Sequence, residues 1–573
     1  MPRWLMLPAY AVALLPALVF WWWQGGAVDV VDAPSARVPC VSYAPYRAGQ
    51  SPLDDALVIP EAQIAEDLDR LAGVTDCVRT YAQVQGLDAV PRLAAERGIT
   101  VMLGAWIGRE REKNERELAS VIALAQRYPE TVRAVIVGNE VLLRQEQPPA
   151  ELAAMIERVR AAVRVPVTYA DVWEFWERNP EIAAAVDFVT IHTLPYWEDD
   201  PRPIEDAVPH VLETWRHIQR LFPGEPVFIG EAGWPSAGRM REGARPGIVE
   251  QARFVRGLMA VAAQEGIGLN VIESFDQPWK RRFEGTVGGH WGLIDADRRT
   301  KFALAGPVSA EPNWRRRFGI SALTGLLLLV AAMSASAASA ISPARWVLAA
   351  LAASAAGSLL TVGVDDGLAS ARTAWDWLVL AIRTASGAAA AGLVFAAILG
   401  ADGSRPVPIA ALVTWLRGSG RPAAGRVHTA LGLVRALALF GFAATTLCLV
   451  FEGRYRDFPV ALYAVPAGAF LMLALMRLID EAEIPGLTDA VAGTDGAGGA
   501  FAEEWLLAVT AVGGALIVVV MEGPANVQAL GWLAVAGAFL AAFALDARAV
   551  AGLYRRSSAR DPSSKPPAAG SAA

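Results

Sequence analysis

The stretch Val-Arg-Ala-Val-Ile-Val-Gly-Asn-Glu at residues 132–140 places a carboxylate directly after a short run of β-branched residues. The stretch Pro-Val-Phe-Ile-Gly-Glu-Ala-Gly-Trp-Pro-Ser at residues 226–236 repeats this arrangement with Glu231. Such runs are typical of strands that are buried in a parallel sheet. Because the C-terminal ends of the strands of a parallel barrel converge on one face, we predict that Glu140 and Glu231 meet there.

Six further β-rich runs alternate with helical patterns between residues 36 and 310. The eight predicted strands are Val38–Tyr43, Cys77–Tyr81, Ile99–Ala105, Arg133–Gly138, Val165–Ala170, Phe188–His192, Val227–Gly230 and Leu269–Ser274. Eight strand–helix repeats over about 270 residues predict an α/β fold of the (β/α)₈ TIM-barrel type. The alternative is an open doubly wound sheet, which is disfavoured because no glycine-rich phosphate turn follows the first strand.

Two carboxylates that face one another are what cleavage of a glycosidic bond requires. The stretches around Glu140 and Glu231 resemble the signatures of glycoside hydrolase family 17, the β-1,3-glucanase family: Asn-Glu after the fourth strand and Glu-x-Gly-Trp-Pro-Ser after the seventh. The resemblance continues through Arg79-Thr-Tyr81, Ser274–Lys280 and His290–Leu293. It implies that Glu140 is the general acid/base and Glu231 the nucleophile of a retaining double displacement that needs neither a metal nor an organic cofactor.

Aromatic residues are dense at the expected mouth of the barrel, and sugar rings stack on such side chains. The aromatic residues concerned are Tyr43, Tyr81, Trp106, Trp173, Trp176, Tyr196, Trp197, Trp279 and Trp291. Any one of them could equally belong to the core. The predicted substrate-binding residues are Asn139, Tyr43, Tyr81, Tyr196, Trp234, Trp279 and Lys280. An amide at Asn139 can bind the sugar 2-hydroxyl in the transition state.

Three residues near these motifs receive a different interpretation. His192 and His290 are interpreted as structural, because carboxylates already cover the acid and base roles. Gln277 departs from the family pattern, in which many members have Glu three residues before the position of Lys280. The departure is expected to remove one negative charge beside Lys280.

Composition separates two parts of the 573-residue chain, which is 54% apolar and 19% charged overall. Residues 36–310 carry frequent charges, whereas long, nearly uncharged stretches follow Phe318. A net charge of −7 gives no basic footprint for nucleic acid. The three cysteines form no metal-binding motif. Cys40 and Cys77 are expected on the first two strands as buried thiols, with a disulfide as the alternative.

Hydrophobic segments predict eight membrane spans. The first is residues 5–23, interpreted as an uncleaved anchor, and the others are near 318–340, 345–364, 377–400, 434–451, 458–476, 505–521 and 527–545. We therefore predict four regions. They are an anchor and linker (1–35), the barrel (36–310), an all-α membrane domain of about seven helices (311–551) and a disordered cytoplasmic tail (552–573).

Basic residues in short loops and in the tail predict the orientation, because cytoplasmic segments are enriched in Lys and Arg. The residues used are Arg405, Arg417, Arg421, Arg426, Arg435, Arg548, Arg555, Arg556, Arg560 and Lys565. They place both termini in the cytoplasm and the barrel in the periplasm, outside a bacterial inner membrane. Arg315-Arg-Arg317 would then be an exception on the outer side.

The expected partners are a β-glucan and the lipid bilayer, with a glucan synthase in the same membrane as a further possibility and no nucleic acid. The favoured function is cleavage of β-1,3-glucan followed by transfer to an acceptor, in periplasmic β-1,3/1,6-glucan synthesis or remodelling. This preference over plain endo-hydrolysis rests on the membrane-attached layout of resembling bacterial proteins. An alternative of another class is a glucan-binding or glucan-conducting membrane protein.

Overall fold

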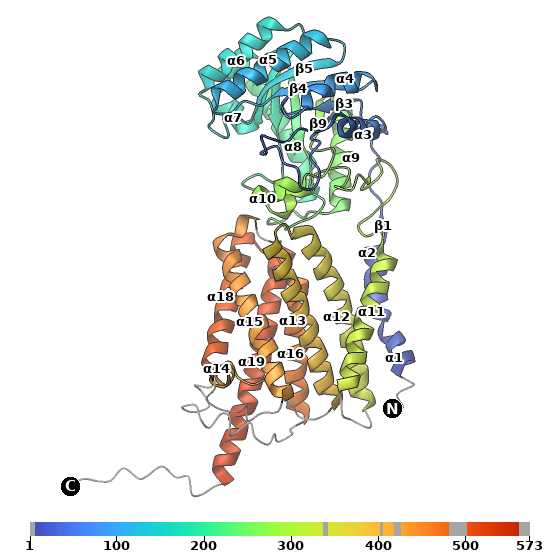
Figure 1. Ribbon diagram of the computed structural model, residues 1–573, viewed down its shortest axis with the longest axis vertical. Helices are drawn as coiled ribbons and strands as arrows, with labels where there is room; N and C mark the ends of the chain where they lie inside the picture. Colours follow the sequence, from blue (N-terminus) through green and yellow to red (C-terminus); the bar gives the residue numbers. More distant parts are fainter. Residues whose placement is uncertain are drawn as a thin grey trace, which may run out of the picture. The chain divides into compact units, whose positions relative to one another are not determined.

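The computed structural model describes residues 6–335, 342–400, 405–417, 426–455, 457–480 and 501–560 (Figure 1). The chain divides into two compact units. Residues 26–310 form one unit, and the segments before and after them together form the other. Each unit is described by itself below.

The first unit contains a closed barrel of eight strands, each parallel to its neighbours. Its strands are β2 (Val41–Ser42), β3 (Cys77–Arg79), β4 (Thr100–Ala105), β5 (Val132–Asn139), β6 (Val167–Val172), β7 (Val189–His192), β8 (Val227–Ala232) and β9 (Gly268–Val271). Because β2 pairs with β9, the sheet has no open edge. The predicted TIM barrel is confirmed, and the open doubly wound sheet is excluded.

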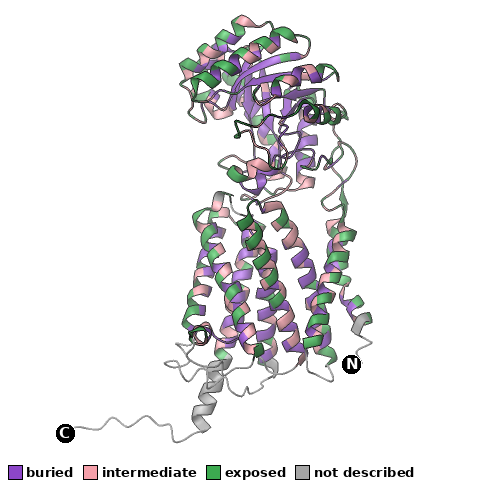
Figure 2. Ribbon diagram, viewed as in Figure 1, coloured by how far each residue is buried: buried purple, intermediate pink, exposed green. Residues whose placement is uncertain are grey.

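Helices cover the outside of this barrel (Figures 1 and 2). They are α3 (Glu61–Leu71), α4 (Val90–Ala95), α5 (Arg111–Arg127), α6 (Pro149–Ala162), α7 (Trp173–Arg178), α8 (Ile204–Leu221) and α9 (Ile248–Glu265). The short α10 (Arg281–Glu284) belongs to the segment that follows β9. In α3, for example, Ile64, Leu68 and Leu71 are buried at the three- and four-residue spacing of one helix face. A two-stranded antiparallel sheet, β1 (Ala27–Val28) with β10 (Val308–Ser309), joins the two ends of this unit and was not predicted.

Alternation along the strands decides which side chains reach the barrel interior. Met102, Ala134 and Ile136 belong to a small cluster with Cys40 and Cys77 inside the barrel. Their neighbours Val101, Leu103, Val135 and Val137 belong to the larger core that includes the surrounding helices. By the same alternation, Ser42 and Arg79 point inward while Val41, Tyr43 and Val78 point outward. This parity positions the functional residues described below.

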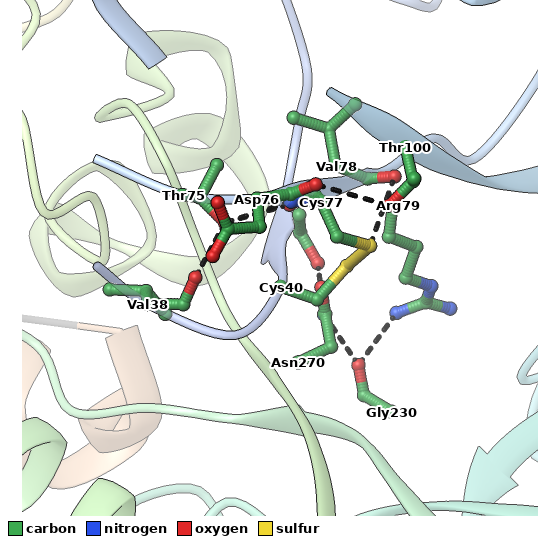
Figure 3. The surroundings of a disulfide bond; sticks show 11 residues. Val38, Cys40, Thr75, Asp76, Cys77, Val78, Arg79, Thr100, Gly230 and Asn270 are labelled. Carbon is green, nitrogen blue, oxygen red and sulfur yellow. Dashed lines mark hydrogen bonds between the residues drawn. A yellow bond between two sulfur atoms is a disulfide. The ribbon is translucent and has the colours of Figure 1, made fainter. Parts of the chain in front are cut away.

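Cys40 and Cys77 form a disulfide inside the barrel, where two buried thiols were favoured from the sequence (Figure 3). That expectation was wrong because both side chains face inward from adjacent strands, with their Cα atoms 4.4 Å apart. Arg79 lies two residues after Cys77 on the same face of β3, and it reaches the Gly230 carbonyl, as does Asn270. The disulfide therefore links β2 and β3 directly next to the layer that holds Arg79.

The second unit is helical (Figure 1). Its main helices are α11 (Trp314–Ala335), α12 (Pro343–Ser370), α13 (Ala374–Gly400), α14 (Ile409–Leu416), α15 (Arg426–Phe451), α16 (Val460–Asp480), α18 (Ala502–Glu522) and α19 (Val527–Arg560). Within the described residues, seven of these, all except α14, are long and apolar enough to cross a membrane. Helix α19 continues to Arg560, past the expected start of a disordered tail at 552, and residues 561–573 lie outside the described part.

The N-terminal apolar stretch forms two short helices, α1 (Met6–Ala13) and α2 (Leu15–Gln24), rather than one continuous helix. Pro16 at the beginning of α2 lacks a backbone donor and interrupts the hydrogen-bond ladder there. The stretch is nevertheless packed on the other helices, because Trp21 donates from Nε1 to the Ser321 hydroxyl at 3.0 Å. Gly325 permits this close packing, since a Cβ there would lie 2.4 Å from the Tyr10 hydroxyl.

A buried ionic cluster lies inside this helical unit. Arg435 of α15 contacts Glu504 and Asp546, each at 3.1 Å, and all three side chains are at most 10% exposed. Arg405 lies 4.0 Å from the same Asp546. Arg405 and Arg435, which the orientation argument treated as loop residues, are thus buried beside acidic partners. Of the other residues in that argument, Arg421 and Lys565 lie outside the described part of the chain.

Candidate active site

The end of strand β8 holds Glu231 in a buried, positively charged setting. The Glu231 Oε1 atom accepts hydrogen bonds from Arg79 Nη1 at 2.6 Å and from the Tyr81 hydroxyl at 2.9 Å. The Arg79 guanidinium also lies over the Tyr81 ring, 4.6 Å from its centre. Burial alone would raise the pKa of Glu231, but the charges of His192, Arg79 and Lys280 and the Tyr81 hydrogen bond together hold that pKa below its usual range. Glu231 is therefore a buried carboxylate that is kept ionised.

Glu140 follows strand β5 in an unusual backbone conformation. Its φ of 53° lies in the left-handed region, which side-chain-bearing residues rarely adopt. The conformation is stabilised by the Glu140 N–H, which donates to the Ala170 carbonyl, and by the Glu140 carbonyl, which accepts from the Arg144 N–H. The side chain is 23% exposed, against 5% for Glu231. A strained residue of this kind is a frequent feature of functional sites.

His192, at the end of β7, lies between the two carboxylates. Its Nδ1 atom is 3.0 Å from Glu140 Oε1, and its Nε2 atom is 3.7 Å from Glu231 Oε1. One oxygen of Glu140, one oxygen of Glu231 and one ring nitrogen of His192 all lie within 4.8 Å of one another. Two carboxylates at this separation fit the short spacing of retaining glycosidases better than the wide spacing of inverting ones.

Arg79 ties Asn139 to the same group of residues. Its Nη2 atom donates to Asn139 Oδ1, while its Nη1 atom holds Glu231. A guanidinium presents its donors in a fixed planar fork, so one side chain sets the relative positions of both partners. Arg79 is 1% exposed and belongs to the inward-facing layer of β3.

Lys280 lies beside Glu231 and is paired with another carboxylate, Glu273, whose Oε2 atom is 2.8 Å from Lys280 Nζ. Burial raises the pKa of Glu273 to about 7, although Lys280 opposes the shift. Gln277 points elsewhere, because its amide donates to the Ala44 carbonyl and accepts from Trp279 Nε1. Position 277 therefore places no carboxylate beside Lys280, and the carboxylate that pairs with Lys280 is Glu273.

Within the described residues, one group of side chains has donor atoms close enough together to hold a metal ion. It consists of Glu140, His192 and Glu231. The Arg79 guanidinium, however, already lies 2.6 Å from Glu231 Oε1. A fixed positive charge on that atom disfavours a metal ion at the same oxygen. We therefore assign no metal to this group.

Residues 40–292 match the family model described as the BtgE/BtgC glycoside hydrolase domain. The match covers the barrel strands and both carboxylates. The barrel is similar to this glycoside hydrolase domain. It is thus the enzyme domain of the chain.

Two relatives and one solved structure that are similar to the barrel come from fungi. A glucan 1,3-beta-glucosidase of Candida albicans is 26% identical over 276 residues, which are 44% of this chain and 89% of the relative. A glucan 1,3-beta-glucosidase of Schizosaccharomyces pombe is 28% identical over 254 residues, 42% of this chain and 79% of the relative. The crystal structure of a family 17 beta-1,3-glucanosyltransferase from Rhizomucor miehei is 25% identical, covers 46% of this chain and 94% of its own, and has a TM-score of 0.41.

The barrel brings part of the predicted binding set to the carboxylates. Asn139, Tyr81 and Lys280 join Glu140 and Glu231 through the contacts described above. Trp279 directly precedes Lys280, is partly exposed and donates from Nε1 to Gln277.

Tyr43, Tyr196 and Trp234 do not join this group. Tyr43 faces the helical layer, where its hydroxyl donates to Asp67 of α3, because Ser42 takes the inward position on the strand. Tyr196 and Trp234 are both 0% exposed and pack against each other, with Tyr196 donating to the Arg239 carbonyl and Trp234 to the Arg245 carbonyl. The prediction that these three bind substrate is corrected accordingly: they are core residues around the candidate site.

The sequence-based prediction gave no site role to three residues that contact Glu140, Glu231 or Lys280 in the structure. They are Arg79, His192 and Glu273. The available signal was strand parity: Arg79 shares the inward face of β3 with Cys77, and His192 closes β7 directly beside Glu231 in the sheet register. Glu273 had no such signal, because its pairing with Lys280 depends on the loop after β9.

Proposed function

We propose that the barrel is a retaining enzyme that cleaves β-1,3-glucosidic bonds and passes the released glucan to an acceptor. The observation that carries the proposal is the pair of close carboxylates in unequal surroundings. Glu231 is buried among cationic groups and is ionised, which suits a nucleophile. Glu140 is more exposed than Glu231, and its Oε1 atom is 3.0 Å from His192 Nδ1. These surroundings suit a group that donates and accepts a proton.

In the first half-reaction, Glu231 attacks the anomeric carbon and the glycosidic C–O bond breaks. Among the described residues, the hydrogen bonds donated to the Glu231 carboxylate both go to Oε1, so Oε2 is the attacking atom. Glu140 donates its proton to the departing oxygen, which leaves as a sugar hydroxyl. The Asn139 amide, oriented by Arg79 through its oxygen, donates to the sugar 2-hydroxyl.

In the second half-reaction, Glu140 removes the proton of an incoming hydroxyl, whose oxygen attacks the anomeric carbon. The ester bond to Glu231 breaks, and Glu231 leaves as a carboxylate that Arg79 and Tyr81 stabilise. Water as the acceptor gives hydrolysis. A glucan hydroxyl as the acceptor gives a new 1,3 or 1,6 linkage by the same steps.

The substrate assignment comes from the relatives, because the Candida albicans and Schizosaccharomyces pombe proteins are named for action on 1,3-β-glucan. The preference for transfer comes from the second unit. A scavenging hydrolase gains from release, whereas this barrel is continuous with seven helices that are apolar enough to span a membrane. The helices anchor the enzyme in a bacterial inner membrane, where a glucan synthase is the natural partner for remodelling.

The barrel faces the periplasm in this proposal, and both termini are cytoplasmic. The basic run Arg315-Arg-Arg317 would lie on the outer side, where the orientation rule disfavours arginines. The ion pairs of Arg317 weaken this objection. Arg317 pairs with Glu311 at 2.7 Å and with Asp365, so its charge is neutralised locally. An ion-paired arginine weighs less in orientation than a solvated one.

The experiment is incubation of the full-length chain, in detergent micelles, with β-1,3-linked glucose oligosaccharides of defined length. Product lengths are followed by mass spectrometry and linkages by NMR. Products longer than the starting material support transfer, and shorter products alone reduce the function to β-1,3-glucan hydrolysis. An absence of turnover overturns the proposal.

Glu140→Gln is expected to slow natural oligosaccharides by about 10²- to 10⁴-fold, because the departing sugar oxygen then receives no proton. A dinitrophenyl glycoside leaves without a proton, so its bond cleavage is expected to lose roughly tenfold or less. Pre-steady-state release of dinitrophenol measures that step separately from the breakdown of the ester. Equal losses on both substrates would contradict the role given to Glu140.

A further inference from the structure

Trp106 differs from the other aromatic residues that were expected at the barrel mouth. Trp106 is 40% exposed, whereas Tyr43, Tyr196 and Trp291 are at most 2% exposed. It directly follows β4, the strand that pairs with the Glu140-bearing β5. An exposed tryptophan at this position has no role in the core.

The backbone that carries Trp106 is fixed by four side chains. The Trp106 N–H donates to Glu117 at 3.1 Å, and the Gly108 N–H donates to Asn114 Oδ1 at 2.8 Å. The Gly108 carbonyl accepts from Asn114 Nδ2 at 2.8 Å and from Gln147 at 2.6 Å. The Ile107 carbonyl accepts from Arg144 at 3.4 Å. The exposed ring is therefore presented on an ordered segment, which lowers the entropy cost of binding to it.

Arg144 connects Trp106 to the carboxylates. Its guanidinium lies over one face of the Trp106 ring, 4.2 Å from the ring centre. Its Nη1 atom is 4.0 Å from Glu140 Oε2, and its Nη2 atom is held by Glu146 at 2.8 Å. The cation–π contact fixes the orientation of the ring relative to Glu140.

The location indicates which sugar the ring would meet. In a retaining mechanism the acid/base carboxylate lies next to the bond between the cleaved sugar and the leaving group, so the acceptor sugar enters on its side. Arg144 contacts Trp106 and lies 4.0 Å from Glu140, so Trp106 is connected to the acid/base carboxylate and not to the nucleophile Glu231. Aromatic rings bind the apolar face of a pyranose.

We propose that Trp106 is the acceptor-binding platform of this enzyme, with Arg144 as the residue that positions it. The glucose ring of the acceptor packs on the part of Trp106 that Arg144 leaves uncovered, and its hydroxyl is thereby presented to Glu140. This inference rests on the proposed function. It deepens that function by naming a residue that favours glucan over water as the acceptor.

The test compares Trp106→Leu with Tyr128→Leu in the full-length chain. Both substitutions remove a ring that an arginine covers, but Tyr128 precedes β5 and therefore lies at the opposite, N-terminal end of the barrel. With an aryl β-1,3-oligoglucoside as donor and laminaribiose as acceptor, Trp106→Leu is expected to raise the KM for the acceptor and lower the transfer-to-hydrolysis ratio by about tenfold each. Tyr128→Leu is expected to leave both unchanged.

Trp106→Phe provides a second variant that keeps a flat ring, and its ratio is expected to lie between those of the wild type and Trp106→Leu. A ratio and an acceptor KM that stay at the wild-type values in Trp106→Leu overturn the inference while the proposed function stands. A wild-type chain that transfers nothing but still hydrolyses the donor overturns the acceptor platform. A wild type without any turnover overturns both proposals.

Discussion

Glu231→Gln is expected to reduce both hydrolysis and transfer by about 10⁴-fold or more. The amide keeps the shape of the side chain but cannot form the ester with the anomeric carbon. It also removes the negative charge that Arg79, Tyr81 and Lys280 surround. Initial rates with β-1,3-linked oligosaccharides measure the loss. Glu265→Gln, which alters an exposed glutamate paired with Arg216, is the control and is expected to keep full activity.

The stereochemistry of a rescue reaction separates the roles of the two carboxylates. In Glu231→Ala, azide can occupy the space of the missing carboxylate and attack an aryl β-glucoside from that face, which gives an α-glucosyl azide. In Glu140→Ala, azide instead attacks the ester on Glu231 and gives a β-glucosyl azide. NMR of the azide products distinguishes the anomers. The reverse pattern would exchange the assigned roles of Glu140 and Glu231.

The fold could be predicted from the sequence because its signals are local. Each strand of the barrel is a short β-branched run, and each covering helix repeats apolar residues on one face, as Ile64, Leu68 and Leu71 do. The seven apolar helices are similarly readable from length and hydropathy. Local signals did not indicate the break between α1 and α2 at Pro16, nor the beginning of α15 at Arg426, eight residues before the span expected from residue 434.

The candidate site was predictable only in part, because side-chain direction depends on features that run across the sheet. Glu140 and Glu231 end their strands, so their convergence follows from barrel topology alone. Tyr43 also follows a strand and was therefore expected at the same site. In the structure Ser42 points into the barrel, so the neighbouring Tyr43 points outward. Trp234 lies three residues after Glu231 and nonetheless turns into the core.

The role of Arg79 could not be predicted from the sequence for a related reason. A buried arginine is costly unless its partners are present, and those partners lie 60 and 152 residues away in the sequence. Its meaning becomes clear only when β3, β5 and β8 are placed in one barrel. The Cys40–Cys77 disulfide, which lies on the same inward face, is a comparable case.

Arg79→Met is expected to lower kcat/KM by about 10²- to 10³-fold and to destabilise the barrel by about 3–5 kcal/mol. The substitution leaves Glu231 without its nearest charge and Asn139 without its orienting donor. Arg298→Met is a matched control. Arg298 is also buried and also holds a buried carboxylate, Asp67 at 2.9 Å, but neither residue contacts Glu140 or Glu231.

The pH profile separates a catalytic effect of Arg79 from a loss of stability. Arg79 helps to depress the pKa of Glu231, and Glu231 must be ionised to attack, so activity in the wild type is lost only as the pH falls through that depressed value. Without Arg79 the pKa of Glu231 rises, and the acid limb of the kcat/KM profile moves to higher pH. Arg79→Lys retains the charge but not the fork, so its acid limb is expected near the wild-type position while kcat stays low. Arg298→Met is expected to lower the unfolding temperature without moving the acid limb. An unshifted acid limb in Arg79→Met would mean that His192 and Lys280 alone keep Glu231 ionised, and the role given to Arg79 would be wrong.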